Sequence, residues 1–134
     1  MNFVTIKNSD NKKFSINRDN VYRAYRTSCS DYEEDGFVFD TFLHRFHFLE
    51  QELDAEDCSK LEDLLHSLVG LYDASDDITY YINKDKIVAL EETTKLLVKD
   101  GEKYSEPCVK VRLENGASIY VFSTMDELLK KLNE

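Results

Sequence analysis

Four side chains near the middle of the chain are of types that bind zinc. They are His44, His47, Cys58 and His66. Zinc needs several nitrogen or sulfur ligands that converge on one point. Residues three apart on a strand face opposite ways, and no pair here has the spacing of a zinc motif. We therefore expect structural or surface histidines and predict no metal site.

Cysteine is the second residue type that could do chemistry. The chain has three cysteines, Cys29, Cys58 and Cys108, without a C-x-x-C pair or a disulfide-like spacing. A nucleophilic cysteine needs a thiolate activated by a neighbouring base, whereas free cysteines are commonly buried apolar residues. The sequence also lacks the glycine patterns of nucleotide-phosphate loops. We therefore predict a non-enzymatic protein without a cofactor.

Carboxylates dominate the charge of the chain. With 17 Lys and Arg against 27 Asp and Glu, the formal net charge is −10. Such a field repels nucleic acid and anionic lipid and attracts basic partners. The acid is concentrated in three clusters, which are Asp31, Glu33, Glu34 and Asp35; Glu50, Glu52, Asp54 and Glu56 with the adjoining Asp57; and Asp73, Asp76 and Asp77.

The second cluster has an acidic residue at every second position from Glu50 to Glu56. If this stretch is extended, its carboxylates project on one face about 6.6 Å apart, a row that a phosphate-binding groove could accept. If Leu53 and Ala55 are helical, the row is scattered instead. The simpler alternative is a solvated acidic surface that keeps the chain soluble. Any partner surface is expected on the first two clusters, Asp57 included.

These features favour a cytoplasmic protein-binding module. Its acidic and aromatic surface would occupy a basic, nucleic-acid-binding site of another protein and act as a DNA mimic, as immunity or phage counter-defence inhibitors do. The missing apolar leader and the odd number of cysteines favour the cytoplasm. An alternative is a binder of small anionic ligands that uses Arg18, Arg23 and Arg26 in a cleft between two halves of the chain.

Two segments of the chain occur twice. Residues 14–21 align with residues 80–87 and share the pattern I-N-[RK]-D-x-[VI], and residues 59–68 align with residues 123–132 with four identities in ten. We therefore predict an α+β fold made by tandem duplication of a strand-rich ββββα unit, with pseudo-two-fold packing of residues 1–68 against residues 69–134. An unpaired sheet edge could also serve a homodimer.

The pattern within each unit predicts its elements. In the second unit we expect strands at 78–82, 87–90, 108–113 and 119–122, a type I′ turn at Asn115-Gly116 and a hairpin tip at Asp100-Gly101. In the first unit we expect strands at 3–6, 14–16 and 21–25, with the last strand replaced by residues 51–57. Residues 37–49 fit either a helix or a strand, and we favour strand. Helices are expected to start at Ser59 and Ser123.

The second unit resembles small bacterial proteins of the FlbD/SwrD type. The matching residues are Asn83, Asp85, Ile87, Glu91, Gly116, Tyr120, Val121, Ser123, Asp126, Glu127 and Leu132. This resemblance covers about half of the chain and implies strands followed by a short terminal helix. It also implies a flagellar-type regulatory or structural role, and it supplies no catalytic residues.

Overall fold

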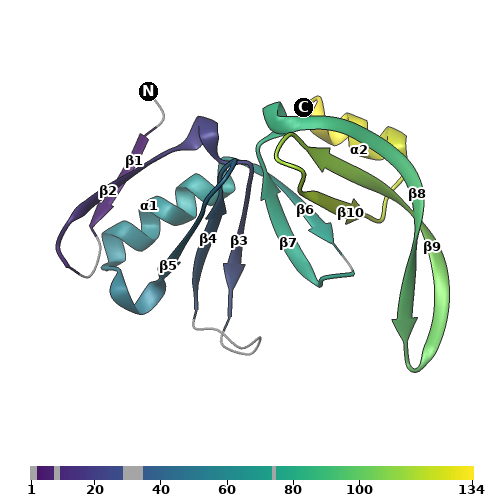
Figure 1. Cartoon of the computed structure of the whole chain (residues 1–134), viewed down its shortest axis with the longest axis horizontal. Helices are drawn as coiled ribbons and strands as arrows, with labels where there is room; N and C mark the ends of the chain where they lie inside the picture. Colours follow the sequence, from purple (N-terminus) through teal and green to yellow (C-terminus); the bar gives the residue numbers. More distant parts are fainter. Residues whose placement is uncertain (1–2, 8–9, 29–34, 74) are drawn as a thin grey trace.

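The computed structural model describes residues 3–7, 10–28, 35–73 and 75–134. They form an α+β fold with a large antiparallel sheet and two helices (Figure 1). The strand order of the large sheet is β5-β4-β3-β7-β6-β10-β9-β8, and β1 and β2 form a separate two-stranded sheet. The predicted fold class is therefore confirmed at the level of an α+β protein with antiparallel strands.

The first half contains five strands and one helix. Its elements are β1 (Phe3–Lys7), β2 (Lys13–Asn17), the 3₁₀ turn η1 (Arg18–Asn20), β3 (Arg23–Thr27), β4 (Gly36–Asp40), β5 (Arg45–Leu49), the 3₁₀ turn η2 (Glu50–Glu52) and α1 (Ala55–His66). The ambiguous stretch at 37–49 is thus two strands, as favoured from the sequence. Phe46 and Phe48 alternate toward the apolar core of this half, which is the period of a strand and not of a helix.

The second half has the same order of strands and helix, with a 3₁₀ turn matching η1 and no counterpart of η2 among its described residues. They are β6 (Val69–Asp73), β7 (Ile78–Ile82), the 3₁₀ turn η3 (Lys84–Lys86), β8 (Ile87–Lys99), β9 (Glu102–Leu113), β10 (Ser118–Val121) and α2 (Met125–Leu132). The expectation of four strands in each half was wrong, because residues 37–49 form two strands, β4 and β5, and β6 was not predicted. The first half has not lost its last strand, since β5 occupies that place before η2 and α1.

The two helices begin at other residues than predicted. The Asp54 side chain caps α1 by accepting from the Asp57 backbone N–H at 2.8 Å, and Thr124 caps α2 by accepting from the Glu127 N–H at 3.1 Å. Ser59, the expected cap, lies inside α1. The prediction failed because Asp54 and Asp57 repeat the same polar spacing one turn earlier, and the earlier cap lets Ala55 to Cys58 join the helix.

The type I′ turn lies in a different hairpin from the one predicted. Asp100 and Gly101, at the tip of the β8–β9 hairpin, both have positive φ, at 53° and 81°, as a type I′ turn requires. At Asn115-Gly116 only Gly116 has positive φ, at 88°, so the predicted type I′ turn is wrong there. The Leu113 N–H instead donates to the Ala117 carbonyl at 2.9 Å, which closes a loop of three residues.

Each half has its own apolar core. The first core brings the Leu61, Leu64, Leu65 and Leu68 stripe of α1 against β1 to β4. The second gathers residues of β6, β7, β9 and β10 around Leu128 of α2. The Leu stripes therefore lie in separate cores and do not close one common core.

The sheet connects the halves through β3 and β7. The pairing is short, with Arg23 opposite Ile82 and Ala24 opposite Tyr81. It joins the third strand of one half to the second strand of the other, whereas a two-fold axis pairs equivalent strands. The expected pseudo-two-fold relation is therefore not shown by this contact. None of the helices in the described ranges is long and apolar enough to cross a membrane.

Candidate functional site

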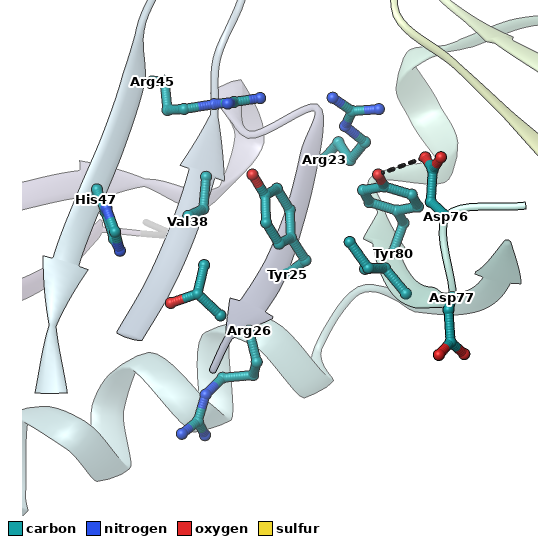
Figure 2. A pocket seen from close by; sticks show the side chains of 11 residues that line it. Arg23, Tyr25, Arg26, Val38, Arg45, His47, Asp76, Asp77 and Tyr80 are labelled. Atoms are coloured by element: carbon teal, nitrogen blue, oxygen red, sulfur yellow. Dashed lines mark hydrogen bonds between the residues drawn. The ribbon is translucent and has the colours of Figure 1, made fainter. Parts of the chain in front are cut away.

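A polar cavity of about 570 Å³ lies where the two halves meet (Figure 2). Alternation along the strands produces it. On β3, Ala24 faces the first core, so that Arg23 and Tyr25 face the other side of the sheet. We call this cavity the arginine pocket, and the residues that line it are Arg23, Tyr25, Arg26, Thr27, Val38, Arg45, His47, Asp76, Asp77, Ile78 and Tyr80.

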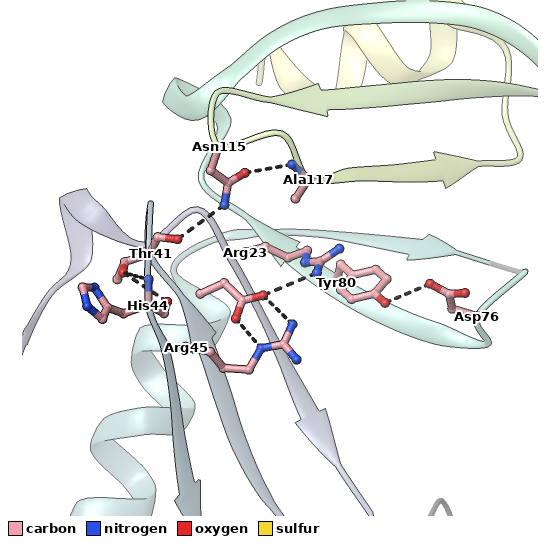
Figure 3. Close-up of polar contacts among 9 residues, drawn as sticks. Arg23, Thr41, His44, Arg45, Asp76, Tyr80, Asn115 and Ala117 are labelled. Atoms are coloured by element: carbon pink, nitrogen blue, oxygen red, sulfur yellow. Dashed lines mark hydrogen bonds and ion pairs between the residues drawn. The ribbon is translucent and has the colours of Figure 1, made fainter.

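One carboxylate holds two arginines beside the pocket. Asp40, at the end of β4, is buried, and its two oxygens accept from Arg45 Nε at 2.7 Å and Arg45 Nη2 at 3.1 Å (Figure 3). Arg23 Nη2 lies 3.4 Å from the same carboxylate. Hydrogen bonds from Arg45 to Asp40 raise the pKa of the Arg45 guanidinium, so Arg45 stays charged. Two guanidinium groups therefore share one buried carboxylate on this side of the pocket.

Arg23 also carries a buried donor without an acceptor. Its guanidinium lies over the Tyr80 ring, 4.6 Å from the centroid, and only 16% of its side chain is exposed. Within the described ranges its Nε has no hydrogen-bond partner. A buried unsatisfied polar atom is unusual in a folded protein.

The opposite wall of the pocket is acidic and belongs to the second half. Asp76 accepts a hydrogen bond from the Tyr80 hydroxyl at 2.9 Å, and Asp77 accepts one from the Tyr72 hydroxyl. Burial and the bond to Asp76 raise the pKa of Tyr80, so its hydroxyl remains a neutral donor. Cationic and anionic walls therefore face the same space.

A further contact joins the halves close to this site. The Asn115 side-chain amide donates to the Thr41 carbonyl at 3.4 Å (Figure 3). Thr41 follows Asp40 directly, and its own hydroxyl bonds with His44 in the turn before β5. The turn that positions Arg45 is thus connected to the second half.

The three arginines suggested from the sequence as anion ligands have different positions in the structure. Arg23 faces the pocket as described above. Arg26 contributes to the lining, but Figure 2 shows its side chain turned away, and its guanidinium pairs with Glu62 at 2.7 Å and Glu50 at 3.2 Å. Arg18 donates to the Ser67 hydroxyl at 2.8 Å and is no part of the pocket. Of these three arginines, Arg23 is the one whose side chain faces the pocket between the halves, as expected for an anion ligand.

The second acidic cluster is not an extended row. Glu50 and Glu52 lie on η2, and Glu56 lies in the first turn of α1, so the stretch is not extended and the condition for a row of carboxylates at strand spacing is not met. Asp57 is buried and accepts from the Lys7 backbone N–H at 3.0 Å. Glu52, Asp54 and Glu56 are exposed. Whether this cluster binds a partner stays a prediction.

The other two clusters have different positions. In the first, Asp31, Glu33 and Glu34 lie outside the described residues, and Asp35 is exposed at the bend before β4. In the third, Asp73 is buried, accepts from the Tyr120 backbone N–H at 3.1 Å and serves the fold. Its neighbours Asp76 and Asp77 form the acidic wall of the pocket.

The structure describes two of the three cysteines, Cys58 and Cys108, whereas Cys29 lies outside the described residues. Burial raises the pKa of both the Cys58 and the Cys108 thiols, which disfavours the thiolate that a nucleophile needs. No cluster of three or more His, Cys, Asp or Glu side chains in the described ranges could hold a metal ion. His47 lines the arginine pocket.

Sequence reasoning missed Arg45, Asp40 and Tyr80. A signal for the first was present, because the segment Arg45-Phe46-His47-Phe48 alternates polar and aromatic residues. A strand with that pattern places Arg45 and His47 together on the face opposite the phenylalanines. The contact between Arg23 and Tyr80 depends on the β3–β7 pairing, for which the sequence carries no signal.

Comparison of the chain with protein-family models, curated proteins and solved structures found no match. The resemblance to flagellar-associated proteins therefore stays a prediction.

Proposed function

We propose that the chain is a non-enzymatic binding protein that holds a small ligand with an anionic group in the arginine pocket. The observation that carries this proposal is the pair of arginines fixed by Asp40, one of which has a buried Nε without an acceptor. A carboxylate or phosphate is the natural acceptor for such donors. The pocket volume of about 570 Å³ lies within the range of small-molecule sites.

The acidic wall narrows the class of ligand. Asp76 and Asp77 would repel a ligand that is anionic throughout, but they would attract a cationic or hydrogen-bond-donating group at its far end. The Tyr25 ring offers apolar contact between the walls, whereas the Tyr80 ring is buried and covered by the Arg23 guanidinium. A dipolar ligand therefore fits better than a polyanion.

Isothermal titration calorimetry with four probes tests the proposal. We would use inorganic phosphate, citrate, glutamate and adenosine monophosphate, of which glutamate carries both signs of charge. R45Q removes a charged donor and should lower affinity by roughly tenfold or more, since such a hydrogen bond is worth about 1.5–3 kcal/mol. R112Q is the matched control, because Arg112 pairs with Glu91 outside the pocket.

Two outcomes would defeat the proposal. One is the absence of measurable heat with every probe. The other is an R45Q variant that binds as tightly as the unaltered chain, because the ligand would then lie elsewhere.

A second candidate is the cytoplasmic acidic inhibitor expected from the sequence. Its support is the net charge of −10 and the exposure of Glu52, Asp54 and Glu56 beside the start of α1. The triple variant E52Q/D54N/E56Q removes this charge while the amide introduced at position 54 keeps the helix cap. A pull-down from the host at low and high salt should recover a basic partner only with the unaltered chain at low salt. A partner that the triple variant retains would exclude this surface.

We also infer that the halves arose by duplication. The support is the shared order of two strands, a 3₁₀ turn, three strands and a helix. The turns η1 and η3 are capped in the same way, since Asn17 accepts from the Asp19 N–H at 3.0 Å and Asn83 from the Asp85 N–H at 3.1 Å. A flagellar-type role is the third proposal, and it rests on the resemblance alone.

A further inference from the structure

The outer edge of β8 is a long unpaired strand edge. β8 runs from Ile87 to Lys99 and pairs along one side with β9, and in the described ranges no strand pairs with its other side. Beyond the end of β10, β8 and β9 continue as a two-stranded ribbon (Figure 1). An edge of this length is a template for another strand unless something covers it.

Apolar side chains are exposed along this edge strand. Val88, Leu96 and Val98 are 62%, 57% and 65% exposed. The β8–β9 register places Leu90 opposite the buried Val111, so Leu90, Leu96 and Val98 lie on the face of the sheet that carries the second core. On this face Glu92 and Thr94 separate Leu90 from the exposed pair Leu96 and Val98.

The sequence of β8 is complementary to itself. When the strand is laid antiparallel on a copy of itself around Thr93, Leu90 faces Leu96 and Glu91 faces Lys95. The two-fold axis produces each of these pairs twice. Val88 also falls opposite Val98. Apolar and opposite-charge cross-strand pairs of this kind stabilise a sheet.

We propose that two copies of the chain associate through β8, which pairs antiparallel with β8 of the second copy about a two-fold axis at Thr93. The contact is isologous, so it closes at a dimer and does not propagate into a fibre. It places two Leu90–Leu96 pairs on the core face, with Glu92 of each copy beside Thr94 of the other between them. It places Glu91 and Lys95 on the opposite face.

The surroundings of the charged pairs agree with this arrangement. Lys95 Nζ lies 4.2 Å from the Tyr120 ring centroid, and Glu91 lies 3.3 Å from Arg112 Nη2. Both side chains are therefore held against the sheet face, where the opposite charge of the second copy would lie beside them. The irregularity in the β8–β9 pairing falls between Ile87 and Ala89, so Leu90 to Leu96 stay in regular register. The arginine pocket contains no residue of β8, so this inference is independent of the proposed function.

Sedimentation over a concentration series tests the dimer. The unaltered chain should shift with concentration toward twice its 15.7 kDa mass. K95E sets a carboxylate of each copy against Glu91 of the other, and dimerisation should weaken by about tenfold. The double variant E91K/K95E restores opposite charges and should restore the dimer. K103E is the matched control, because it reverses the same charge on β9, away from the edge.

L96S is a second probe that leaves the charge unchanged, and it should also weaken the dimer. Amide hydrogen exchange of β8 and β9 in dilute samples shows whether each variant keeps the ribbon. A chain that stays monomeric at every concentration would overturn the proposal. So would a dimer that L96S leaves intact, or one that K103E weakens as much as K95E does.

Discussion

Asp40 determines how much positive charge the arginine pocket presents. The carboxylate is buried and neutralises part of the charge of Arg23 and Arg45. It therefore acts in two opposed ways, because it fixes the donors in place and competes with a ligand for them. Removing its charge should separate these two effects.

We expect D40N to lower stability and raise anion affinity together. Loss of the charged hydrogen bonds should cost about 1–3 kcal/mol in the free energy of unfolding. The uncompensated arginines should bind the anionic probe several-fold more tightly. Denaturant unfolding and calorimetry measure the two quantities. E62Q, which removes the charge from a partner of Arg26, is the control and should leave affinity unchanged. A fall in both quantities would mean that Asp40 only supports the fold.

Tyr80 gives a prediction about alkaline pH. Burial and the bond to Asp76 raise its pKa in the folded state. Its contribution to stability is therefore fully present below the ordinary tyrosine pKa of about 10 and is lost as pH rises through the folded pKa. The free energy of unfolding should fall above pH 10, and it should fall less steeply in Y80F. An equal slope in both chains would show that Tyr80 is not linked to folding.

At the scale of elements, the start of α1 gives a direct test. D54A removes the side chain that caps the helix and should destabilise the fold by about 0.5–2 kcal/mol. S59A changes an exposed residue inside α1 and should stay within about 0.5 kcal/mol. Thermal or urea unfolding compares the two variants. A larger loss in S59A would place the helix start at Ser59 after all.

The elements also show what local pattern can and cannot predict. Alternation placed most strands, including β5, because the period of side chains along a strand is independent of the rest of the fold. The helix start failed because Asp54 and Ser59 are both good caps, and the local pattern does not choose between them. Arg45 could have been found from its alternation with Phe46. Arg45 and Asp76 line the same pocket because β3 pairs with β7, and no local sequence pattern predicts that pairing.

For the whole molecule, the decisive feature is that two cores share one sheet. Most buried residues of each core come from one half, although Tyr22 of the first half lies in the second core, and the β3–β7 pairing between the halves is short. We therefore expect each half to lose its structure separately. L61A should cost about 2–5 kcal/mol and lower exchange protection in the first half while the second stays protected. Hydrogen exchange followed by mass spectrometry resolves the halves, and L71A should produce the mirror result. Equal loss in both halves would mean that the chain unfolds as one unit.

The position of the arginine pocket across the β3–β7 junction has a mechanical consequence. Its cationic wall belongs to one half and its acidic wall to the other, so a molecule that touches both walls would brace a narrow hinge. Ligand binding would then restrict the motion of the two halves relative to each other, without a rearrangement inside either half. Two fluorophores, one on each outer helix face, would convert that restriction into an optical signal, and the chain would become a sensor for its own ligand.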